Sequence, residues 1–133
     1  MIQERIKITP LKAHKDERGR LSKIFDYAAL EGKNIQDIYL TCTIPGENRA
    51  NHYHKKTTEW FCVLKGECVL LLRDRKTKKQ IRMKLDCSNP KLVKIPPFVE
   101  HATKNIGKEE MILLAYANRP YEPSDTVKSS LKF

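Results

Sequence analysis

The feature that most restricts the fold of this chain is a series of short apolar or alternating segments separated by turn-forming residues. Turn signals stand between the segments, as at residues 17–19, 45–48 and 88–90. Short segments bounded in this way predict strands, and many strands at near-regular spacing predict an all-β sandwich or barrel. Only residues 27–31 have a helical pattern, and Gly32 would end that helix within about two turns. The predicted strands are residues 6–8, 21–25, 38–44, 60–64, 68–72, 81–85, 92–95 and 111–117.

The length of 133 residues indicates one hydrophobic core, because each of two cores would be near the size that needs disulfides or metals to fold. We therefore expect a single domain over residues 1–133. Residues 1–7 lack the apolar core of a signal peptide. The longest apolar run, residues 111–117, is far below the roughly 18 residues of a membrane span. These features predict a cytoplasmic protein without a membrane partner.

The cysteines are scattered and form no C-x-x-C pair. Each of Cys42, Cys62, Cys68 and Cys87 lies in or beside an apolar segment, where a free cysteine behaves as a small hydrophobic residue. This distribution predicts free thiols in a reducing compartment. A disulfide between Cys62 and Cys68 stays open as an alternative if the two face each other across a hairpin.

The chain is basic, with 26 Lys and Arg against 16 Asp and Glu and a net charge of +10. This excess indicates an anionic partner, which is a nucleic acid, an acidic lipid or a phosphorylated small molecule. Residues 73–84 hold seven basic residues and one acidic residue, but no aromatic residue that could stack on bases. We interpret this stretch as a solvated hairpin whose lysines keep its edge from pairing, and nucleic acid stays the weaker alternative.

Three of the histidines stand where a metal site could form. His52 and His54 lie two residues apart in a strand-like region, so both imidazoles should enter the barrel while Tyr53 points away. Glu59 places a carboxylate near them, and His101 can supply a fourth ligand from the second half of the chain. Such nitrogen and oxygen donors bind Zn, Mn, Fe, Co or Ni, and we expect a divalent ion, zinc in the first instance.

The spacing of these residues matches a known motif. From Gly46 to Gly66, the intervals to His52, His54 and Glu59 are those of the first cupin motif, without a mismatch. The chain therefore resembles the cupins, whose fold is a jelly-roll β-barrel.

The second cupin motif is matched less closely. Pro96, His101 and Asn105 resemble it, but Phe98 and Pro90 stand where glycines are usual. These departures affect turns rather than ligands, so the resemblance to the cupin fold holds.

Flanking segments narrow the resemblance to the sugar-nucleotide cupins. Residues 15–21 resemble the Asp-x-Arg-Gly segment of the dTDP-4-keto-6-deoxyhexose 3,5-epimerases and 3,4-ketoisomerases. Residues 49–55 resemble their Arg-Gly-x-His-x-His-Lys segment, with Ala50 in place of the glycine. Residues 115–118 and 123–126 are most similar to the metal-binding cupin domain at the end of capsular-polysaccharide UDP-sugar epimerase/reductases.

This resemblance implies an enzyme that epimerises or isomerises a UDP- or dTDP-linked 4-keto-6-deoxyhexose for polysaccharide or glycan synthesis. A ketone at C4 acidifies the C3 proton, and loss of that proton gives an enediolate that must be stabilised. A bound metal would polarise the ketone. Two other functions stay open: a sugar- or metal-binding cupin without turnover, and a metal-dependent cupin dioxygenase.

The resemblance also implies residues that bind the substrate and a homodimer formed through sheet edges. Arg18, Arg49 and Lys55 are candidates for fixed cations that hold the nucleotide diphosphate. Asn51 belongs to the same segment and is a further substrate-binding candidate.

His52 has two incompatible candidate roles. The matching histidine of the metal-free epimerases resembles a catalytic base, but an imidazole whose lone pair binds a metal cannot also accept a proton. We favour metal ligation because the other three ligands are present. Tyr116 and Tyr39 are then the candidates for proton transfer, with Tyr53 the weakest because it should point away from the barrel interior.

Overall fold

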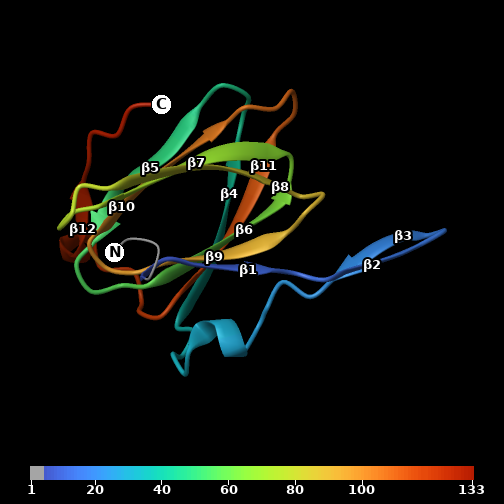
Figure 1. Ribbon diagram of the computed structural model, residues 1–133, viewed down its shortest axis with the longest axis horizontal. Helices are drawn as coiled ribbons and strands as arrows, with labels where there is room; N and C mark the ends of the chain where they lie inside the picture. Colours follow the sequence, from blue (N-terminus) through green and yellow to red (C-terminus); the bar gives the residue numbers. More distant parts are fainter. Residues whose placement is uncertain (1–4) are drawn as a thin grey trace.

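The computed structural model describes residues 5–133 and consists mainly of short strands (Figure 1). Residues 1–4, part of the segment tested for a signal peptide, lie outside the described residues. The elements are β1 (Lys7–Pro10), β2 (Ala13–Asp16), β3 (Gly19–Ser22), the 3-10 helix η1 (Ala28–Leu30), β4 (Asp37–Thr43), β5 (Asn48–His54), β6 (Glu59–Lys65), β7 (Glu67–Asp74), β8 (Gln80–Asp86), β9 (Lys91–Ile95), β10 (Val99–Asn105), β11 (Met111–Ala117), the 3-10 helix η2 (Pro123–Asp125) and β12 (Thr126–Lys128).

Two five-stranded antiparallel sheets face each other and form the barrel. The first sheet has the strand order β1-β9-β6-β11-β4, and the second has the order β12-β5-β10-β7-β8. Strands β2 and β3 form a separate hairpin that projects from the barrel at the right of Figure 1. The prediction of an all-β cupin jelly roll is confirmed, although β2, β10 and β12 were not among the expected strands and β5 was expected only as a strand-like region around His52 and His54.

The main core fills the space between the two sheets. The alternation in β8 decides which side chains enter it: Ile81, Met83 and Leu85 contact the core, while Arg82 and Lys84 are exposed. The buried members of this core are Ile6, Phe61, Val63, Cys68, Leu70, Leu72, Leu85, Val93, Ile95, Val99, Met111, Leu113 and Ala115.

A second apolar cluster covers the outer face of the first sheet. Trp60 and Tyr116 point away from the barrel interior and pack with Ala29 and Leu30 of the segment that links β3 to β4. The Trp60 indole donates a hydrogen bond to the Ala29 carbonyl at 3.2 Å. The helical pattern at residues 27–31 corresponds to the short helix η1 of this covering segment. The first sheet is therefore buried on both faces at its centre.

The cysteines are free, as expected. Cys62 belongs to the outer cluster and Cys68 to the core between the sheets, so the alternative disulfide between them is wrong. Burial raises the pKa of the Cys62 thiol to about 11 and that of Cys68 to about 12. Both thiols are therefore protonated and poorly reactive at neutral pH.

The carboxyl-terminal residues cover part of the outer face of the second sheet. Leu131 packs against Val69, Leu71 and Ala102. Its backbone N–H and carbonyl are both hydrogen-bonded by the Asn51 amide, at 2.9 and 3.0 Å. Among the described residues, no helix is long and apolar enough to cross a membrane.

Candidate active site

A β-bulge sets the direction of the histidines in β5. His52 lies opposite His101 of β10, whereas Ala50 lies opposite the next residue, Ala102, which leaves Asn51 as the extra residue. Both bulge residues have left-handed backbone conformations, with φ of 65° at Ala50 and 63° at Asn51. After the bulge, normal alternation places His52 and His54 on the inner face of the second sheet.

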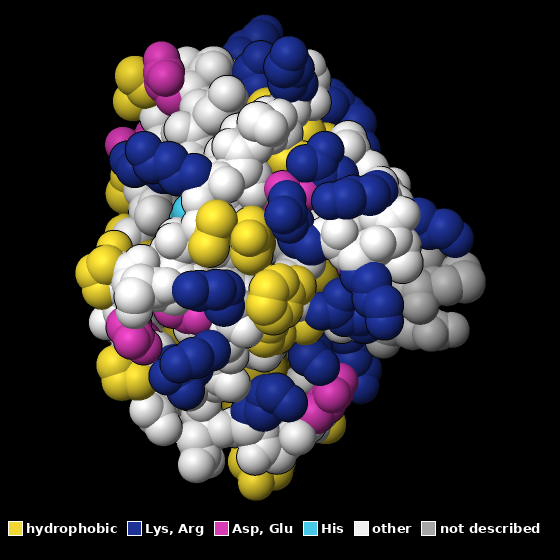
Figure 2. Space-filling model, turned by 90° about the vertical axis from the view of Figure 1, so that its left-hand side faces the viewer, with side chains coloured by type: hydrophobic (Ala, Val, Ile, Leu, Met, Phe, Trp, Pro, Cys, Tyr) yellow, Lys and Arg dark blue, Asp and Glu magenta, His cyan; other side chains and the backbone are white. Residues whose placement is uncertain are grey.

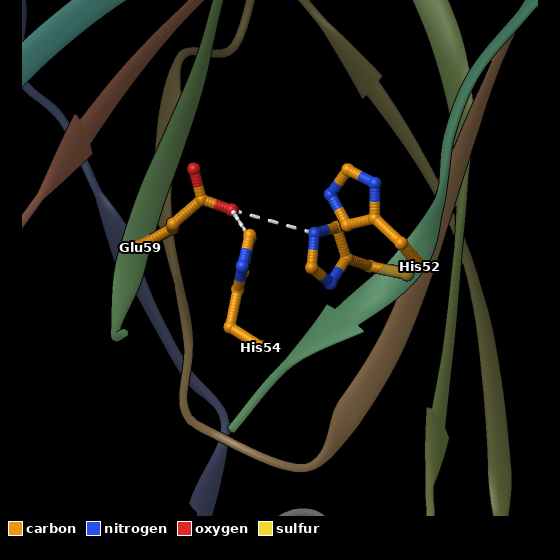
Figure 3. A group of neighbouring side chains, drawn as sticks. His52, His54 and Glu59 are labelled. Carbon is orange, nitrogen blue, oxygen red and sulfur yellow. Dashed lines mark hydrogen bonds and ion pairs between the residues drawn. The ribbon is translucent and has the colours of Figure 1, made fainter. Parts of the chain in front are cut away.

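Glu59 faces these histidines from the first sheet, where it is the first residue of β6 (Figure 3). Its side chain is buried, with 2% of the residue exposed. One donor atom from each of His52, His54, Glu59 and His101 lies within 4.8 Å of the other three. Donors on a tetrahedral ion with bonds of roughly 2.1 Å lie roughly 3.4 Å apart, so the widest pair would have to close by up to about 1.4 Å to share an ion. The structure therefore brings together all four predicted ligands.

His101 has the tautomer that a metal ligand requires. Its Nδ1 lies 3.0 Å from the Val99 carbonyl, to which it donates its proton. Its Nε2 then carries a lone pair, is buried and has no hydrogen-bond partner, although it lies 3.4 Å from the Glu59 carboxylate. A buried nitrogen without a partner is costly in an apolar barrel. A cation among the four side chains would satisfy it, so these residues fit a divalent metal.

His54 is oriented by groups on its outer side. Its Nε2 lies 2.8 Å from Glu59, while its Nδ1 lies 3.3 Å from the Thr126 hydroxyl and 3.8 Å from the Asp125 carboxylate. Asp125 also accepts hydrogen bonds from the backbone of Lys55 and Lys56 and from the Thr57 hydroxyl. The sequence analysis did not single out Asp125 as a site residue, because only the pairing of β12 with β5 brings it to the cluster.

The electrostatics of the cluster favour a neutral His52 and an ionised Glu59. Burial, with smaller contributions from the neighbouring His101 and His54, lowers the pKa of His52 to about 4. Burial alone would raise the pKa of the Glu59 carboxyl, but contacts with His101 and His54 outweigh it and hold that pKa well below its usual value. These are the protonation states that bind a metal.

Tyr39 of β4 reaches the cluster from the first sheet. Its hydroxyl donates a hydrogen bond to the second carboxylate oxygen of Glu59, at 2.5 Å. Burial, together with the negative charge of Glu59, raises the pKa of Tyr39 far above its usual value. The phenol therefore keeps its proton at neutral pH and serves as a hydrogen-bond or proton donor.

The other two tyrosine candidates lie elsewhere. Tyr116 points to the outer cluster and donates a hydrogen bond to the Ile24 carbonyl at 3.0 Å, so the structure does not bring it to the histidines. Tyr53 points outward from β5, as the alternation predicted, and packs against Phe98. Of the three, only Tyr39 lies in the cluster.

Two cavities meet at Tyr39 and His52. The larger has a volume of about 460 Å³, and residues after β11 that the sequence analysis did not single out, including Arg119 and Tyr121, form part of its wall. The smaller has a volume of about 250 Å³ and includes Arg49 in its lining. The cavities differ in charge: four carboxylates line the larger one and none lines the smaller one.

The predicted substrate-binding residues are separated in the structure. Arg49 lies in the smaller cavity, where its guanidinium donates hydrogen bonds to Thr43 and to the Cys42 carbonyl. The Asn51 amide is occupied by the Leu131 backbone, and Lys55 is exposed and lines neither cavity.

Arg18 lies on the projecting β2–β3 hairpin, outside both cavities. Its guanidinium pairs with Asp16 at 2.6 Å. Within one protomer, Arg49 is therefore the only one of the four candidates that lines a cavity next to the cluster.

A family comparison identifies the chain. Residues 14–127 match the sequence model of a protein family, the polysaccharide biosynthesis C-terminal domain. The chain belongs to this family. The resemblance drawn from the motifs is thereby confirmed at the level of the family, and this family also accounts for the similarity to capsular-polysaccharide proteins.

Curated relatives of this polysaccharide biosynthesis domain differ in length. A UDP-2-acetamido-2,6-beta-L-arabino-hexul-4-ose reductase of Pseudomonas aeruginosa is 28% identical over 78 residues, which cover 59% of this chain and 21% of the reductase. The chain thus matches about a fifth of that relative. The spore coat polysaccharide biosynthesis protein SpsL of Bacillus subtilis is 24% identical over 125 residues, which cover 89% of this chain and 82% of SpsL.

Solved structures share the fold of the domain. The dTDP-6-deoxy-D-glucose-3,5-epimerase RmlC of Legionella pneumophila, in complex with dTDP-4-keto-L-rhamnose, has a TM-score of 0.85 at 18% identity, over 96% of this chain and 74% of that one. The sugar 3,4-ketoisomerase QdtA of Thermoanaerobacterium thermosaccharolyticum, in complex with TDP, has a TM-score of 0.80 at 19% identity. The match covers 96% of this chain and 90% of QdtA.

Proposed function

We propose that this protein epimerises C3, or moves the ketone between C3 and C4, of a nucleotide-linked 4-keto-6-deoxyhexose in glycan precursor synthesis. The observation that carries the proposal is the cluster of three histidines, Glu59 and Tyr39 at the junction of two cavities inside the barrel. Family membership and the fold shared with dTDP-sugar epimerases and ketoisomerases support it.

His52, His54, Glu59 and His101 would hold a divalent ion, with zinc the first expectation and Mn, Fe, Ni or Co as alternatives. When bound, such an ion supplies Lewis acidity toward a ketone oxygen. Tyr39, with its hydroxyl on Glu59, holds a proton beside the reacting carbons and returns it to the substrate. With an ion bound, the His52 lone pair would stay on the ion and water in the larger cavity would take the C3 proton; in an ion-free site His52 would take it. Either way the substrate loses one proton and gains one from Tyr39, whose hydroxyl is then reprotonated from solvent.

The charge difference between the two cavities favours one orientation of the bound substrate. The larger cavity is lined by four carboxylates, Asp37, Glu59, Glu122 and Asp125, and by one cation, Arg119, which pairs with Glu122 at 3.5 Å. The excess of negative charge repels a diphosphate. The smaller cavity is lined by Arg49 and no carboxylate. We therefore assign the sugar ring to the junction and the larger cavity, and the diphosphate to the Arg49 side.

A homodimer is part of the same proposal. β4 is an edge strand, and its outward side chains Ile38 and Leu40 are 60% and 57% exposed. Arg18, which reaches neither of the two cavities at the cluster in its own protomer, would contact substrate there only across such an interface. Light scattering of the purified protein tests the dimer, and a monomer at all concentrations would remove Arg18 from the substrate-binding set.

The deciding experiment is solvent-deuterium exchange at C3 of a UDP- or dTDP-4-keto-6-deoxyhexose. We expect deuterium to enter the recovered sugar in the presence of the wild-type protein and not of Tyr39→Phe. No exchange with any such substrate would contradict the proposal and favour a binding protein without turnover. Stoichiometric iron with oxygen uptake would favour the dioxygenase alternative.

Glu59→Gln tests the metal ligands separately. We expect metal affinity to fall by at least about tenfold, measured as metal content after dialysis, because the anionic ligand is lost. Glu110→Gln, which changes an exposed glutamate outside the cavities, is the matched control. Unchanged metal content in Glu59→Gln would remove this residue from the ligand set.

A further inference from the structure

Five exposed lysines at one end of the barrel have no part in the site described above. Lys55 and Lys56 follow β5, and Lys76, Lys78 and Lys79 lie in the turn between β7 and β8. Within residues 5–133, no acidic side chain forms an ion pair with any of the five. Half of the net charge of +10 therefore stands on two short loops.

Backbone hydrogen bonds hold these two loops together. The Phe98 N–H donates to the His54 carbonyl at 2.8 Å, and the Arg75 N–H donates to the Phe98 carbonyl at 3.0 Å. Phe98, which directly precedes β10, therefore joins the end of β5 to the β7–β8 turn. Figure 2, which faces this end of the molecule, shows Lys and Arg side chains around a hydrophobic patch.

Phe98 is an exposed aromatic residue in an unfavourable backbone conformation. Its φ is 64°, in the left-handed region, which is a genuine outlier for a bulky residue, and 45% of it is exposed. Its ring packs 5.9 Å from that of Tyr53, on which the Arg75 guanidinium also stacks at 4.8 Å. Backbone strain at an exposed aromatic residue suggests that the side chain of that residue has a function.

The arginines at this end are already paired, so the free cations are lysines. Arg5 pairs with Asp74, while Arg73 and Arg75 pair with the buried Glu100. Lysine ammonium groups attract anions as point charges, without the fork geometry that reads individual phosphates. One exposed ring also provides no row of aromatic residues for stacking successive bases. Diffuse positive charge around one apolar side chain suits an anionic bilayer surface better than a nucleic acid.

We propose that this end of the barrel, Phe98 surrounded by the five lysines, docks on a membrane surface rich in anionic lipid headgroups. This differs from two expectations drawn from the sequence: that the basic hairpin only keeps the protein soluble, and that the protein has no membrane partner. Asp125 lines the larger cavity and also binds the backbone of Lys55 and Lys56, so the docking surface lies beside the wall of that cavity. The proposal does not depend on the reaction proposed above.

Co-sedimentation with vesicles tests the proposal on the full chain. We expect binding to phosphatidylcholine vesicles that contain phosphatidylglycerol, weakening with added salt, and no binding to pure phosphatidylcholine. Lys55→Gln with Lys56→Gln should weaken binding by roughly fivefold for each lysine removed. The matched control replaces Lys65 and Lys108 with Gln and should leave binding unchanged. Both lysines are exposed, Lys65 at the end of β6 and Lys108 in the turn between β10 and β11.

Phe98→Gly separates docking from folding. Glycine accepts the left-handed conformation, so this variant should fold at least as well as wild type while its vesicle affinity falls roughly fivefold to tenfold. The proposal is overturned if the wild type does not bind anionic vesicles, or if the control pair loses as much affinity as Lys55 and Lys56. Displacement from vesicles by a short oligonucleotide, with tighter binding to the oligonucleotide, would also overturn it and assign the surface to nucleic acid.

Discussion

Among the described residues, five that are not glycine have left-handed backbone conformations, and two of them stand where related cupin motifs have glycine. These two, Ala50 and Phe98, have φ of 65° and 64°. At Ala50 the conformation forms the bulge that turns His52 into the barrel. The structure therefore explains both departures from the motifs: the chain keeps the turn geometry and accepts the strain.

Replacing Ala50 with glycine should stabilise the protein. Relief of the left-handed strain outweighs the added flexibility of the unfolded chain by about 0.5–1 kcal/mol. Urea unfolding of Ala50→Gly would measure this difference. A loss of stability would mean that the Ala50 methyl group makes packing contacts worth more than the strain.

Tyr39→Phe should separate proton transfer from metal binding. The variant keeps Glu59 and the three histidines but loses the hydroxyl, so we expect kcat to fall roughly 10²- to 10⁴-fold with unchanged metal content. Tyr27→Phe, in which the altered residue is 77% exposed, is the control. Wild-type turnover in Tyr39→Phe would exclude this tyrosine as the proton donor.

At the scale of elements, a buried carboxylate at the end of a strand accepts hydrogen bonds that fix the following loop. Asp74 ends β7 and accepts hydrogen bonds from the Lys76 and Thr77 N–H groups and from Arg5. Burial would raise the pKa of Asp74, but these donors outweigh it and lower that pKa below its usual value. A carboxyl with a lowered folded-state pKa stabilises the fold above its unfolded pKa of about 3.9, and this contribution is lost as pH falls through the folded value.

Asp74→Asn should therefore destabilise the protein at neutral pH by about 1–3 kcal/mol. The difference from wild type should shrink progressively as the pH falls below about 4, because the carboxyl of the unfolded chain is protonated first and that of the folded chain only at a lower pH. Chemical unfolding between pH 3 and pH 7 checks both statements. Asp26→Asn, at a half-buried carboxyl that accepts a hydrogen bond from the Ala28 N–H and has no ion pair with any residue that the structure describes, should show a smaller effect at all pH values. A difference that stays constant with pH would contradict this account.

At the scale of the whole molecule, the histidine cluster connects the two sheets. The histidines come from the second sheet, and Glu59 comes from the first. An ion bound by all four would link the sheets in the folded state only, so it should stabilise the fold.

Metal removal should therefore lower stability. Zinc at 100 to 1,000 times its Kd should stabilise the chelator-treated protein by about 3–4 kcal/mol, seen as a higher Tm. His101→Gln should abolish most of this shift, whereas His14→Gln, at an exposed histidine, should not. An unchanged Tm with zinc and with each of the other candidate metals would contradict the metal proposal.

The sequence was sufficient for the barrel and for the four candidate ligands, because strand alternation and motif spacing are local. It was insufficient for the tyrosines: β11 is apolar on both faces, since residues before β4 cover its outer side, so alternation did not reveal that Tyr116 points outward. The bulge at Asn51 likewise breaks the alternation. Arg119 and Asp125 come to the site only through the return of the chain after β11, which no local spacing encodes.

The grip of Asn51 on Leu131 has a practical consequence. Asn51, whose amide binds the Leu131 backbone, directly precedes His52 in the sequence. A displacement of the carboxyl-terminal residues would therefore act on a residue next to a candidate ligand. A folded partner fused directly after Phe133 that displaced Leu131 would leave the Asn51 amide without these hydrogen bonds, next to His52. Biochemical tests of metal content and turnover are therefore best made with any added sequence at the amino terminus.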